Sequence, residues 1–433
     1  MKHWVSHQIG EFFTYTIPGE WGMPATLHSS VPVVRSTNFR EDGSLDLTDF
    51  VFRAILPERL EKRKVSQGDI LVEKSGGGPM QPAGRVVYCD ADFGGTCSNF
   101  IEIAKVREQY DSKFIFYFLY QLYKSGLVLK YQQQTTGIIN FKFGEYKLES
   151  VKIPSERAEQ SAIAIVLSTV DRAIEQTEAL IAKYQRIKTG LMHDLLTRGI
   201  DEHGNLRDPA THKFKDSPLG RIPEEWEAVT LKDLVRVLHG YAFSGNFYSD
   251  QDNGFILLTP GNFSVLGGLY FEPRNTKYYT GYVPEEFVLR NGDVLVVMTD
   301  LTKEMAILGN AVKLNHPYKI LHNQRIGLVK PFHQEDIDSD FLVLVMNSAF
   351  GKSVIKAAAT GTTVRHTSPD KICSALIPLP QPSEQKQITA VIEQMNGKEY
   401  SLKQQDAKLR RLKTGLMQDL LTGKVSVEPL IGR

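Results

Sequence analysis

Cysteine is scarce in this sequence. Only Cys89, Cys97 and Cys373 occur among 433 residues, an odd number without Cys-x-x-Cys spacing. This usage fits a reducing compartment and argues against a disulfide framework or a cysteine-ligated zinc site. We therefore expect a cytoplasmic protein that is not stabilised by disulfide bonds.

Long apolar runs are also missing. No stretch approaches the roughly 20 apolar residues of a membrane span, and residues 1–10 show no apolar core of a signal peptide. Hydrophobic residues at 42% and charged residues at 23% are average for a soluble globular protein. The length allows about two to four domains, so the sequence predicts a soluble multidomain protein without a membrane partner.

The chain has no excess of charge of one sign. Lysine and arginine total 51, against 50 aspartates and glutamates. No global electropositive field therefore indicates a nucleic-acid partner, and any site for a polyanion must be a local patch.

Catalytic motifs are absent as well. The sequence contains neither the glycine-rich loop and Asn-Pro-Pro-aromatic motif of adenine methyltransferases nor a Walker A loop. GDILVEK at 68–74 resembles half of a metal-dependent nuclease site, but the similar GDVLVVMTD at 292–300 lacks its Glu and Lys. A turn leading into a buried strand explains the shared Gly-Asp better. We therefore predict no catalytic residue and no metal site.

What the sequence does contain is an internal repeat. KTGLMHDLLT at 188–197 returns 225 residues later as KTGLMQDLLT at 413–422, with a single letter changed. GDILV and GDVLV, two Ile-Pro pairs and two Glu-Gln pairs follow at offsets of 224 or 225, and Trp4 and Trp226 open the two copies. The chain is therefore predicted to be an internal duplication of one structural unit.

Each copy ends in a segment with helical periodicity. Apolar residues alternate at spacings of four and three over 163–195 and again over 388–420, the pattern of a coiled-coil seam. The pattern predicts two helices of about 35 to 40 residues, roughly 50 to 60 Å long. The seams either only bury each other or leave further faces for a partner.

Each helix follows a stretch in which short β-rich runs alternate with turns. One helix is predicted in each stretch, at 112–126 and at 340–358, which indicates an α+β domain. The predicted plan is an α+β domain at 1–153, a long helix at 154–197, a connector at 198–225, a second domain at 226–380, a second helix at 381–425 and a tail at 426–433.

Tracts rich in hydrogen-bonding side chains are the candidate DNA-binding residues. The two main tracts, KYQQQTTGIINFKFG at 130–144 and ATGTTVRHTS at 359–368, precede the long helices. VRSTNFR at 34–40 and HNQRIG at 322–327 are weaker candidates. Such side chains read base edges or bind phosphates, whereas a solvated loop is the alternative for any single residue. The candidates are Arg35, Thr37, Asn38, Lys74, Lys130, Gln132, Gln133, Gln134, Thr135, Asn140, Lys142, Asn262, Asn323, Gln324, Arg325, Thr362, Thr363, Arg365 and His366.

This combination resembles the specificity subunit of Type I restriction-modification systems over nearly the whole chain. The resemblance is carried by the duplicated helix ending, GDILV and GDVLV, the Ile-Pro and Glu-Gln pairs and IPEEW at 222–226. It implies a non-catalytic subunit in which two target-recognition domains are separated by two antiparallel coiled-coil helices, with a pseudo-twofold repeat. Each domain would read one half of a bipartite, asymmetric target in double-stranded DNA. The helices would set the spacing and dock two methyltransferase subunits.

The resemblance also places the cofactors on other subunits. S-adenosylmethionine would be bound by the methyltransferase subunits, and ATP and Mg²⁺ would serve the restriction subunits of the full complex. The first copy departs from the pattern because it begins almost at Met1, without a full IPEEW lead. Residues at equivalent positions of the two helix endings are the expected partner-binding set, with simple solvation as the alternative: Arg186, Lys188, Leu191, Arg411, Lys413 and Leu416.

Two other functions fit the same residues. The chain could be a coiled-coil scaffold whose α+β domains bind proteins, or a recognition fragment of a single-chain methyltransferase-nuclease. DNA binding by gel shift at stated salt separates the scaffold from a DNA reader. A methyl-transfer assay on the lone chain separates the enzyme fragment from both.

Overall fold

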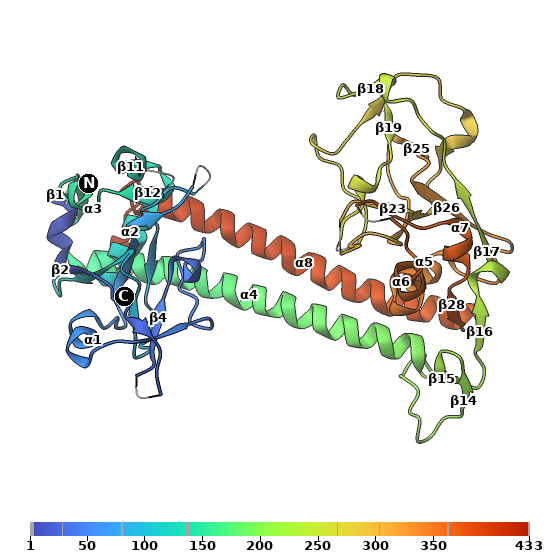
Figure 1. Cartoon of the computed structure of the whole chain (residues 1–433), viewed down its shortest axis with the longest axis horizontal. Coiled ribbons are helices and arrows are strands. Elements are labelled where there is room, and N and C mark those ends of the chain that lie inside the picture. The colour runs from blue at the N-terminus through green and yellow to red at the C-terminus, as the bar shows by residue number, and fades with distance from the viewer. Residues whose placement is uncertain are drawn as a thin grey trace. The chain divides into compact units, whose positions relative to one another are not determined.

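The chain folds into two compact units. The computed structural model describes residues 4–27, 29–78, 81–135, 138–265, 267–302, 304–361 and 363–431. Unit 1 comprises Met1–Ala179 with Lys403–Arg433, and unit 2 comprises Leu180–Leu402. Each unit contains one α+β domain and about half of each long helix, α4 (Arg157–Thr197) and α8 (Pro382–Leu420) (Figure 1). Among the described residues, no helix is long and apolar enough to cross a membrane.

The domain of unit 1 is built on short sheets. One has the strand order β2-β10-β6-β8, a second has the order β3-β5-β4-β9, and a third has the order β11-β12-β7, while β1 pairs with β13. Their bounds are β1 Trp4–Gln8, β2 Phe13–Pro18, β3 Met23–Pro24, β4 Val31–Val34, β5 Val51–Ala54, β6 Ile70–Glu73, β7 Ser75–Gly76, β8 Val86–Tyr88, β9 Thr96–Cys97, β10 Ile101–Val106, β11 Gln132–Thr135, β12 Ile138–Phe141 and β13 Ser150–Pro154; the short helices are α1 Pro57–Arg63, α2 Ser112–Lys124, α3 Phe143–Tyr146 and α9 Glu428–Ile431.

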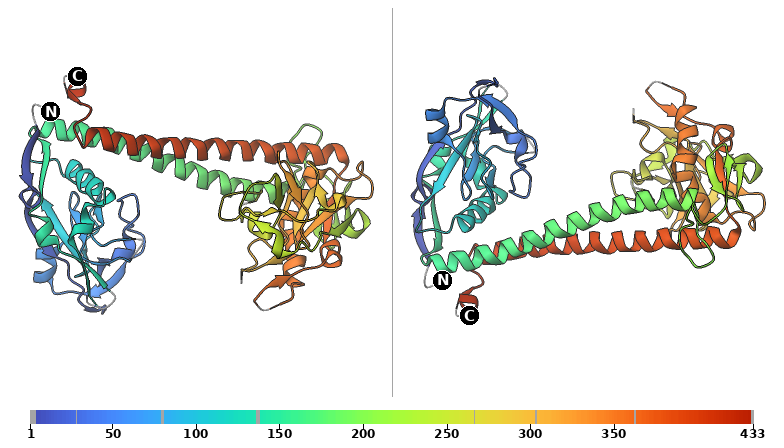
Figure 2. Two further views of the ribbon diagram at one scale, coloured as in Figure 1. Left: turned by 90° about the horizontal axis from the view of Figure 1, so that it is seen from above. Right: turned by 90° about the horizontal axis from the view of Figure 1, so that it is seen from below.

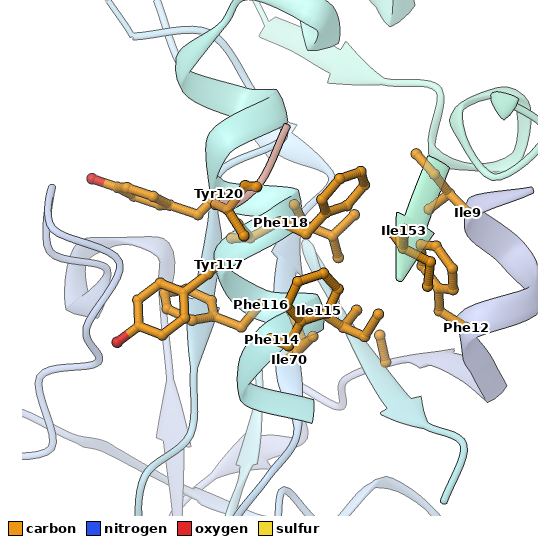
Figure 3. Close-up of a cluster of buried hydrophobic side chains, with 14 of the residues drawn as sticks. Ile9, Phe12, Ile70, Phe114, Ile115, Phe116, Tyr117, Phe118, Tyr120 and Ile153 are labelled. Carbon is orange, nitrogen blue, oxygen red and sulfur yellow. The ribbon is translucent and has the colours of Figure 1, made fainter. Parts of the chain in front are cut away.

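Helix α2 contributes seven consecutive buried residues, Phe114 to Tyr120, to the core of this domain. It begins where the Asp111 carboxylate accepts a hydrogen bond from the Phe114 backbone N–H at 2.9 Å, a typical N-cap. Its aromatic residues pack against Ile70 and against Phe12 and Ile153, which come from the first and last parts of the domain (Figure 3). Burial of so many aromatic side chains stabilises the domain and fixes α2 against the sheet.

The domain of unit 2 repeats this arrangement. The sheet β17-β26-β22-β24 corresponds to β2-β10-β6-β8, and a five-stranded sheet has the order β18-β20-β19-β25-β21. Strands β23 and β27, β16 and β28, and β14 and β15 form pairs. The bounds are β14 Phe214–Ser217, β15 Gly220–Pro223, β16 Glu227–Thr230, β17 Val235–His239, β18 Tyr248–Ser249, β19 Phe255–Leu257, β20 Tyr278–Tyr279, β21 Val288–Leu289, β22 Val294–Val297, β23 Thr299–Asp300, β24 Ala311–Lys313, β25 Lys319–Leu321, β26 Ile326–Pro331, β27 Arg365–His366 and β28 Leu376–Leu379, with helices α5 Ser339–Asn347, α6 Ala349–Ala357 and α7 Pro369–Cys373.

The shared Gly-Asp pairs have the structural role predicted for them. Gly68 and Gly292 adopt positive φ angles of 93° and 94° in the turns before β6 and β22. Asp69 then binds Lys105 at 2.5 Å, and Asp293 binds Lys330 at the same distance. Since each carboxylate also accepts a backbone N–H three residues upstream, the motif closes a turn in both copies. The predicted internal repeat is thus confirmed.

A buried glutamine joins each domain to its following helix. Gln160 accepts from the Asp111 backbone N–H at 3.0 Å and donates to the Pro154 carbonyl at 2.9 Å. In unit 2, Gln385 makes the corresponding bonds to Asp338 at 2.8 Å and Pro380 at 2.9 Å. Both glutamines are fully buried, so each ties the start of a long helix to its own domain.

Helices α4 and α8 pair antiparallel within each unit (Figure 2). In unit 1, Asp171 binds Lys413 at 2.7 Å and Glu178 binds Arg410. In unit 2, Lys188 binds Glu399 at 3.4 Å. Ile392 of α8 packs in the same core as Leu195 and Leu196 of α4. The prediction of two long antiparallel helices carrying a coiled-coil seam is confirmed.

The single helix predicted at 340–358 is wrong, because the structure has two helices there. Helix α5 ends at Asn347, whose side chain binds both the N–H and the carbonyl of Ala311, at 3.0 and 2.7 Å. Ser348 is extended, with ψ 175°, and its hydroxyl accepts from the Phe350 N–H at 3.2 Å to begin α6. These side-chain hydrogen bonds compete with the helical ones and break the helix.

A glycine shortly after each long helix lies beside a tryptophan. Gly199 has φ 66°, and an added Cβ there would lie 2.3 Å from the Trp226 ring. Gly423 has φ 71° and stands in the same relation to Trp4, at 3.0 Å. In unit 1, Trp4 near one end of the described chain thus lies beside Gly423 near the other, as Trp226 lies beside Gly199 in unit 2.

Candidate nucleic-acid interface

In unit 1 the loops that follow two parallel strands lie at one edge of a sheet. Strand β4 pairs in parallel with β9, Val33 opposite Thr96 and Val34 opposite Cys97. The carboxyl ends of parallel neighbours point the same way, so residues 35–37 and 98–100 emerge side by side. The Ser98 N–H donates to the Val34 carbonyl at 2.8 Å and holds the two loops together.

Lys74 brings the glutamine-rich tract to the same edge. Its backbone N–H donates to the Phe100 carbonyl at 2.8 Å, and its own carbonyl accepts from the Phe141 N–H at 2.7 Å. Strand β7 then pairs with β12, which pairs with β11, Gln133 opposite Asn140. The predicted tracts at 34–40, 74 and 130–142, which are far apart in sequence, are thus contiguous in the fold.

Several polar side chains of this edge are available to a ligand. Thr37, Lys130, Gln133 and Gln134 are exposed. The side chain of Thr135 and residues 136 and 137 lie outside what the structure describes.

Other predicted residues of this tract are engaged within the fold. The Gln132 amide donates to the carbonyls of Ala83 at 2.8 Å and Val128 at 2.9 Å. Asn140 is bound to the Ser75 hydroxyl at 2.6 Å. Internal ion pairs hold Arg35 to Asp49 at 2.7 Å, Lys74 to Glu102 at 2.8 Å and Lys142 to Glu145 at 3.1 Å.

Asn38 and Asn262 occupy equivalent places and support the backbone of their own domains. The Asn38 amide accepts from the Arg35 N–H at 2.9 Å and donates to two carbonyls. Asn262 accepts from the Thr259 N–H at 2.8 Å and donates to the Asn275 carbonyl at 3.0 Å. Both are buried, so we assign these two predicted DNA contacts a structural role.

Unit 2 presents the same edge with different residues. Strands β19 and β25 are parallel, and the loop after β25 contains Asn323, Gln324 and Arg325. The Met298 N–H donates to the Arg325 carbonyl, and the Met298 carbonyl accepts from the Thr367 N–H, both at 3.0 Å. The tracts predicted at 322–327 and 359–368 therefore meet at Met298, as their counterparts meet at Lys74 in unit 1.

The side chains at this second edge are also of two kinds. Gln324, Arg325, Thr363 and His366 are exposed, whereas Asn323 is buried and accepts from the Arg325 N–H at 3.0 Å. The exposed His366 also has a local partner, because its ring lies 3.1 Å from the Thr299 hydroxyl. Of the remaining residues, Arg365 donates to the Gly361 carbonyl at 2.6 Å and Thr362 lies outside the described residues.

Sequence reasoning missed one loop of the first edge, Ser98–Phe100. Asn99 is exposed and 54% of the Phe100 side chain is accessible to solvent. The loop stands where Asn323–Arg325 stands in unit 2, at an offset of 225 residues. The repeat relates this loop to Asn323–Arg325, but the loop itself has fewer polar residues than its counterpart, so composition alone did not identify it.

The charges near the first edge are neutralised inside the protein. Arg85 binds the buried Glu73 through two nitrogens, at 2.7 and 2.8 Å, and this hydrogen bonding raises the pKa of Arg85. At the opposite end of β6, burial raises the pKa of the Asp69 carboxyl, even though Lys105 opposes the shift. Among the described residues, no group of three potential metal ligands comes together. The edge therefore offers hydrogen-bonding groups to a ligand, because the nearby carboxylates of Glu73 and Glu102 are already paired within the protein.

The predicted partner-binding residues fall into two classes. Arg186 and Arg411 are exposed on the helices. Lys188 and Lys413 are engaged with Glu399 and Asp171 in the helix pair. Leu191 and Leu416 are partly buried against the cores of unit 2 and unit 1, respectively.

Comparison with known proteins identifies the family. The family model described as Type I restriction modification DNA specificity domain matches residues 1–185 and 223–410. The chain belongs to this family. It is a DNA-target-recognition subunit of the Type I restriction-modification class, as the resemblance predicted.

Individual relatives agree with this. The chain is 28% identical over 327 residues to the Type I restriction enzyme MjaVIII specificity subunit of Methanocaldococcus jannaschii, covering 72% of this chain and 71% of that protein. It is 22% identical over 211 residues to the EcoBI specificity subunit of Escherichia coli, covering 48% and 41%. The S subunit structure from M. genitalium has a similar fold, with a TM-score of 0.57 at 16% identity and 96% of each chain covered.

Proposed function

We propose that each domain reads one half of a bipartite, asymmetric DNA sequence with the edge described above. The observation that carries this proposal is that both units gather their polar tracts at an equivalent edge, around Lys74 and Met298. The exposed side chains differ between the copies, Gln133 and Gln134 in one and Gln324 and Arg325 in the other. Different hydrogen-bonding groups select different bases, so two unlike half-sites follow.

We also propose that the two helices set the spacing of the half-sites and dock two methyltransferase subunits. The repeated surface supports this, because two copies of one surface can bind two copies of one partner. Arg186 and Arg411 are equivalent and exposed, which makes them the best candidates for contact. Lys188 and Lys413 hold the helix pair together and would act on docking indirectly.

The chain is proposed to have no catalytic activity of its own. Adenine methylation with S-adenosylmethionine would belong to the methyltransferase subunits, and ATP-driven translocation and cleavage to restriction subunits. The engagement of Asp69, Glu73 and Lys74 with separate internal partners supports this, since they do not form a shared metal site. The complex would act in the cytoplasm.

The decisive test maps methylated adenines in cells that express this chain with its methyltransferase. A variant carrying Gln133→Ala and Gln134→Ala should relax one half-site, at about 1 to 3 kcal/mol per lost base contact, and leave the other unchanged. The matched variant, Gln324→Ala with Arg325→Ala, should relax the other half-site only. A loss of both half-sites in either variant, or of neither, contradicts the assignment.

The spacing can be tested by lengthening α4. A second copy of residues 177–180, inserted after Leu180, advances the helix by about 6 Å and turns it only about 40° beyond a full turn, so the seam is largely kept. DNA rises about 3.4 Å per base pair. The non-specific spacer should therefore grow by one or two base pairs while both half-sites stay the same. An active variant with an unchanged spacer would show that the helices do not set the spacing.

A further inference from the structure

The loop Ser98–Phe100 is held rigidly yet exposes a large apolar side chain. Three backbone hydrogen bonds fix it: Ser98 N–H to the Val34 carbonyl, Ile101 N–H to the Ser98 carbonyl and Lys74 N–H to the Phe100 carbonyl, at 2.8 to 3.0 Å. The Phe100 side chain nevertheless remains 54% exposed. Since its backbone is constrained on both sides, the direction in which the side chain leaves the backbone is set by the fold.

The surroundings of Phe100 are the polar edge itself. Residues 35–37 lie on one side of the loop, and Lys74 with the tract at 138–142 lies on the other. Isolated exposed apolar residues are common on proteins and need no explanation. An apolar ring in the middle of a row of hydrogen-bonding groups is different, because a base edge presents one apolar group, the thymine methyl.

The internal repeat gives an independent argument. The position equivalent to Phe100 in unit 2 is Arg325, also exposed and also held through its carbonyl, by the Met298 N–H. Arginine suits guanine, whereas phenylalanine suits the methyl group of thymine. The same place in the fold thus carries two side chains that select opposite kinds of base pair.

We propose that Phe100 contacts the C5-methyl group of a thymine and thereby specifies one base pair in the half-site read by unit 1. This inference rests on the proposed function, because it assumes that the edge lies on DNA. Asn99, exposed beside it, is placed to hydrogen-bond the neighbouring base or phosphate.

The test uses the methyltransferase complex and synthetic duplexes that carry the mapped target. Phe100→Ala should reduce methylation of the target about 5- to 100-fold, through one position of one half-site. Each thymine of that half-site is replaced in turn by uracil, which keeps the pairing and removes only the methyl group. At one position this should weaken binding of the unchanged protein about three- to fivefold and have no effect on Phe100→Ala.

A matched control is Tyr15→Ala, which removes an aromatic side chain of similar exposure, 48%, from the same domain. Tyr15 lies opposite Lys105, near the far end of β10 from Phe100, and its removal should not alter specificity. Phe100→Leu keeps an apolar contact and should retain part of the preference, and thermal melting verifies that every variant is folded.

The outcomes separate this inference from the proposed function. If the unchanged complex methylates no bipartite target, the proposed function fails. If it does so but no uracil substitution matters, or Phe100→Ala still distinguishes thymine from uracil, only the role of Phe100 is refuted. Loss of affinity in Phe100→Ala at all sequences alike would indicate an apolar wedge between bases and would also overturn the inference.

Discussion

Glu384 is the residue whose removal should most weaken unit 2. Its carboxylate, only 9% exposed, accepts from the Ile200 N–H at 2.8 Å and the Trp226 indole N–H at 2.9 Å. It also binds two nitrogens of Arg207. One side chain of α8 thus joins the segment that follows α4, at Ile200 and Arg207, to the start of the second domain at Trp226.

The magnitude follows from the groups left behind in Glu384→Ala. Arg207 is only 11% exposed, and breaking a buried pair by removing one partner costs about 3 to 5 kcal/mol. The N–H groups of Ile200 and Trp226 lose their acceptor as well, at about 1 to 3 kcal/mol each when water cannot replace it. Because these costs overlap within one network, we expect a total loss of about 4 to 6 kcal/mol.

Tryptophan fluorescence is a suitable assay. The chain has three tryptophans, and Trp226 is the one in unit 2. In a background with Trp4→Phe and Trp21→Phe, the denaturation midpoint reports unit 2 separately, which matters because two units need not unfold in one step.

The double variant Glu384→Ala, Arg207→Met gives the control. It removes the unpaired guanidinium, so it should recover a large part of the loss if the buried charge is the main cost. A loss below about 1 kcal/mol for Glu384→Ala alone would refute the reasoning, since a solvated surface pair is worth no more than that.

Three further perturbations have defined outcomes. His322 is buried and its burial lowers its pKa, so the unfolded chain binds a proton that the folded chain resists; stability of unit 2 should fall as pH drops below about 6.5, and His322→Gln should flatten that dependence in pH-dependent melting. Gly351→Ala should cost about 1 to 3 kcal/mol, because its Cβ would lie 2.4 Å from the Met346 carbonyl oxygen, whereas Gly397→Ala in α8 meets nothing within 4 Å and should be neutral or stabilising in the same denaturation assay. Asn38→Ala should cost unit 1 about 2 to 3 kcal/mol by leaving a backbone donor and two carbonyls unpaired, which calorimetry would show.

The features that the sequence predicted best depend on local pattern and repetition. The long helices follow from apolar spacing over many turns, and α2 at 112–124 was expected within 112–126. The Gly-Asp turns followed from glycine's access to positive φ, which both copies use. Such local patterns can be recognised without knowing which residues pack against them.

The features that escaped prediction depend on contacts distant in sequence. The break after Asn347 is made by its bonds to Ala311, 36 residues away. Gln132 was grouped with Gln133 and Gln134, but its amide is bound to the carbonyls of Ala83 and Val128, while the other two are exposed. Composition places such residues in one tract, and only pairing of the strands decides which of them faces the solvent.

The buried glutamines Gln160 and Gln385 bind only backbone atoms of the domains that precede them. Backbone N–H and carbonyl groups are the same whatever side chains a domain carries. A domain of entirely different sequence, provided that its strand and helix N-terminus keep their places, would meet the same glutamine with the same geometry. These hydrogen bonds therefore place no demand on the side chains of the preceding domain, so we expect exchange of a domain at Ile153-Pro154 or Ile377-Pro378 to preserve them.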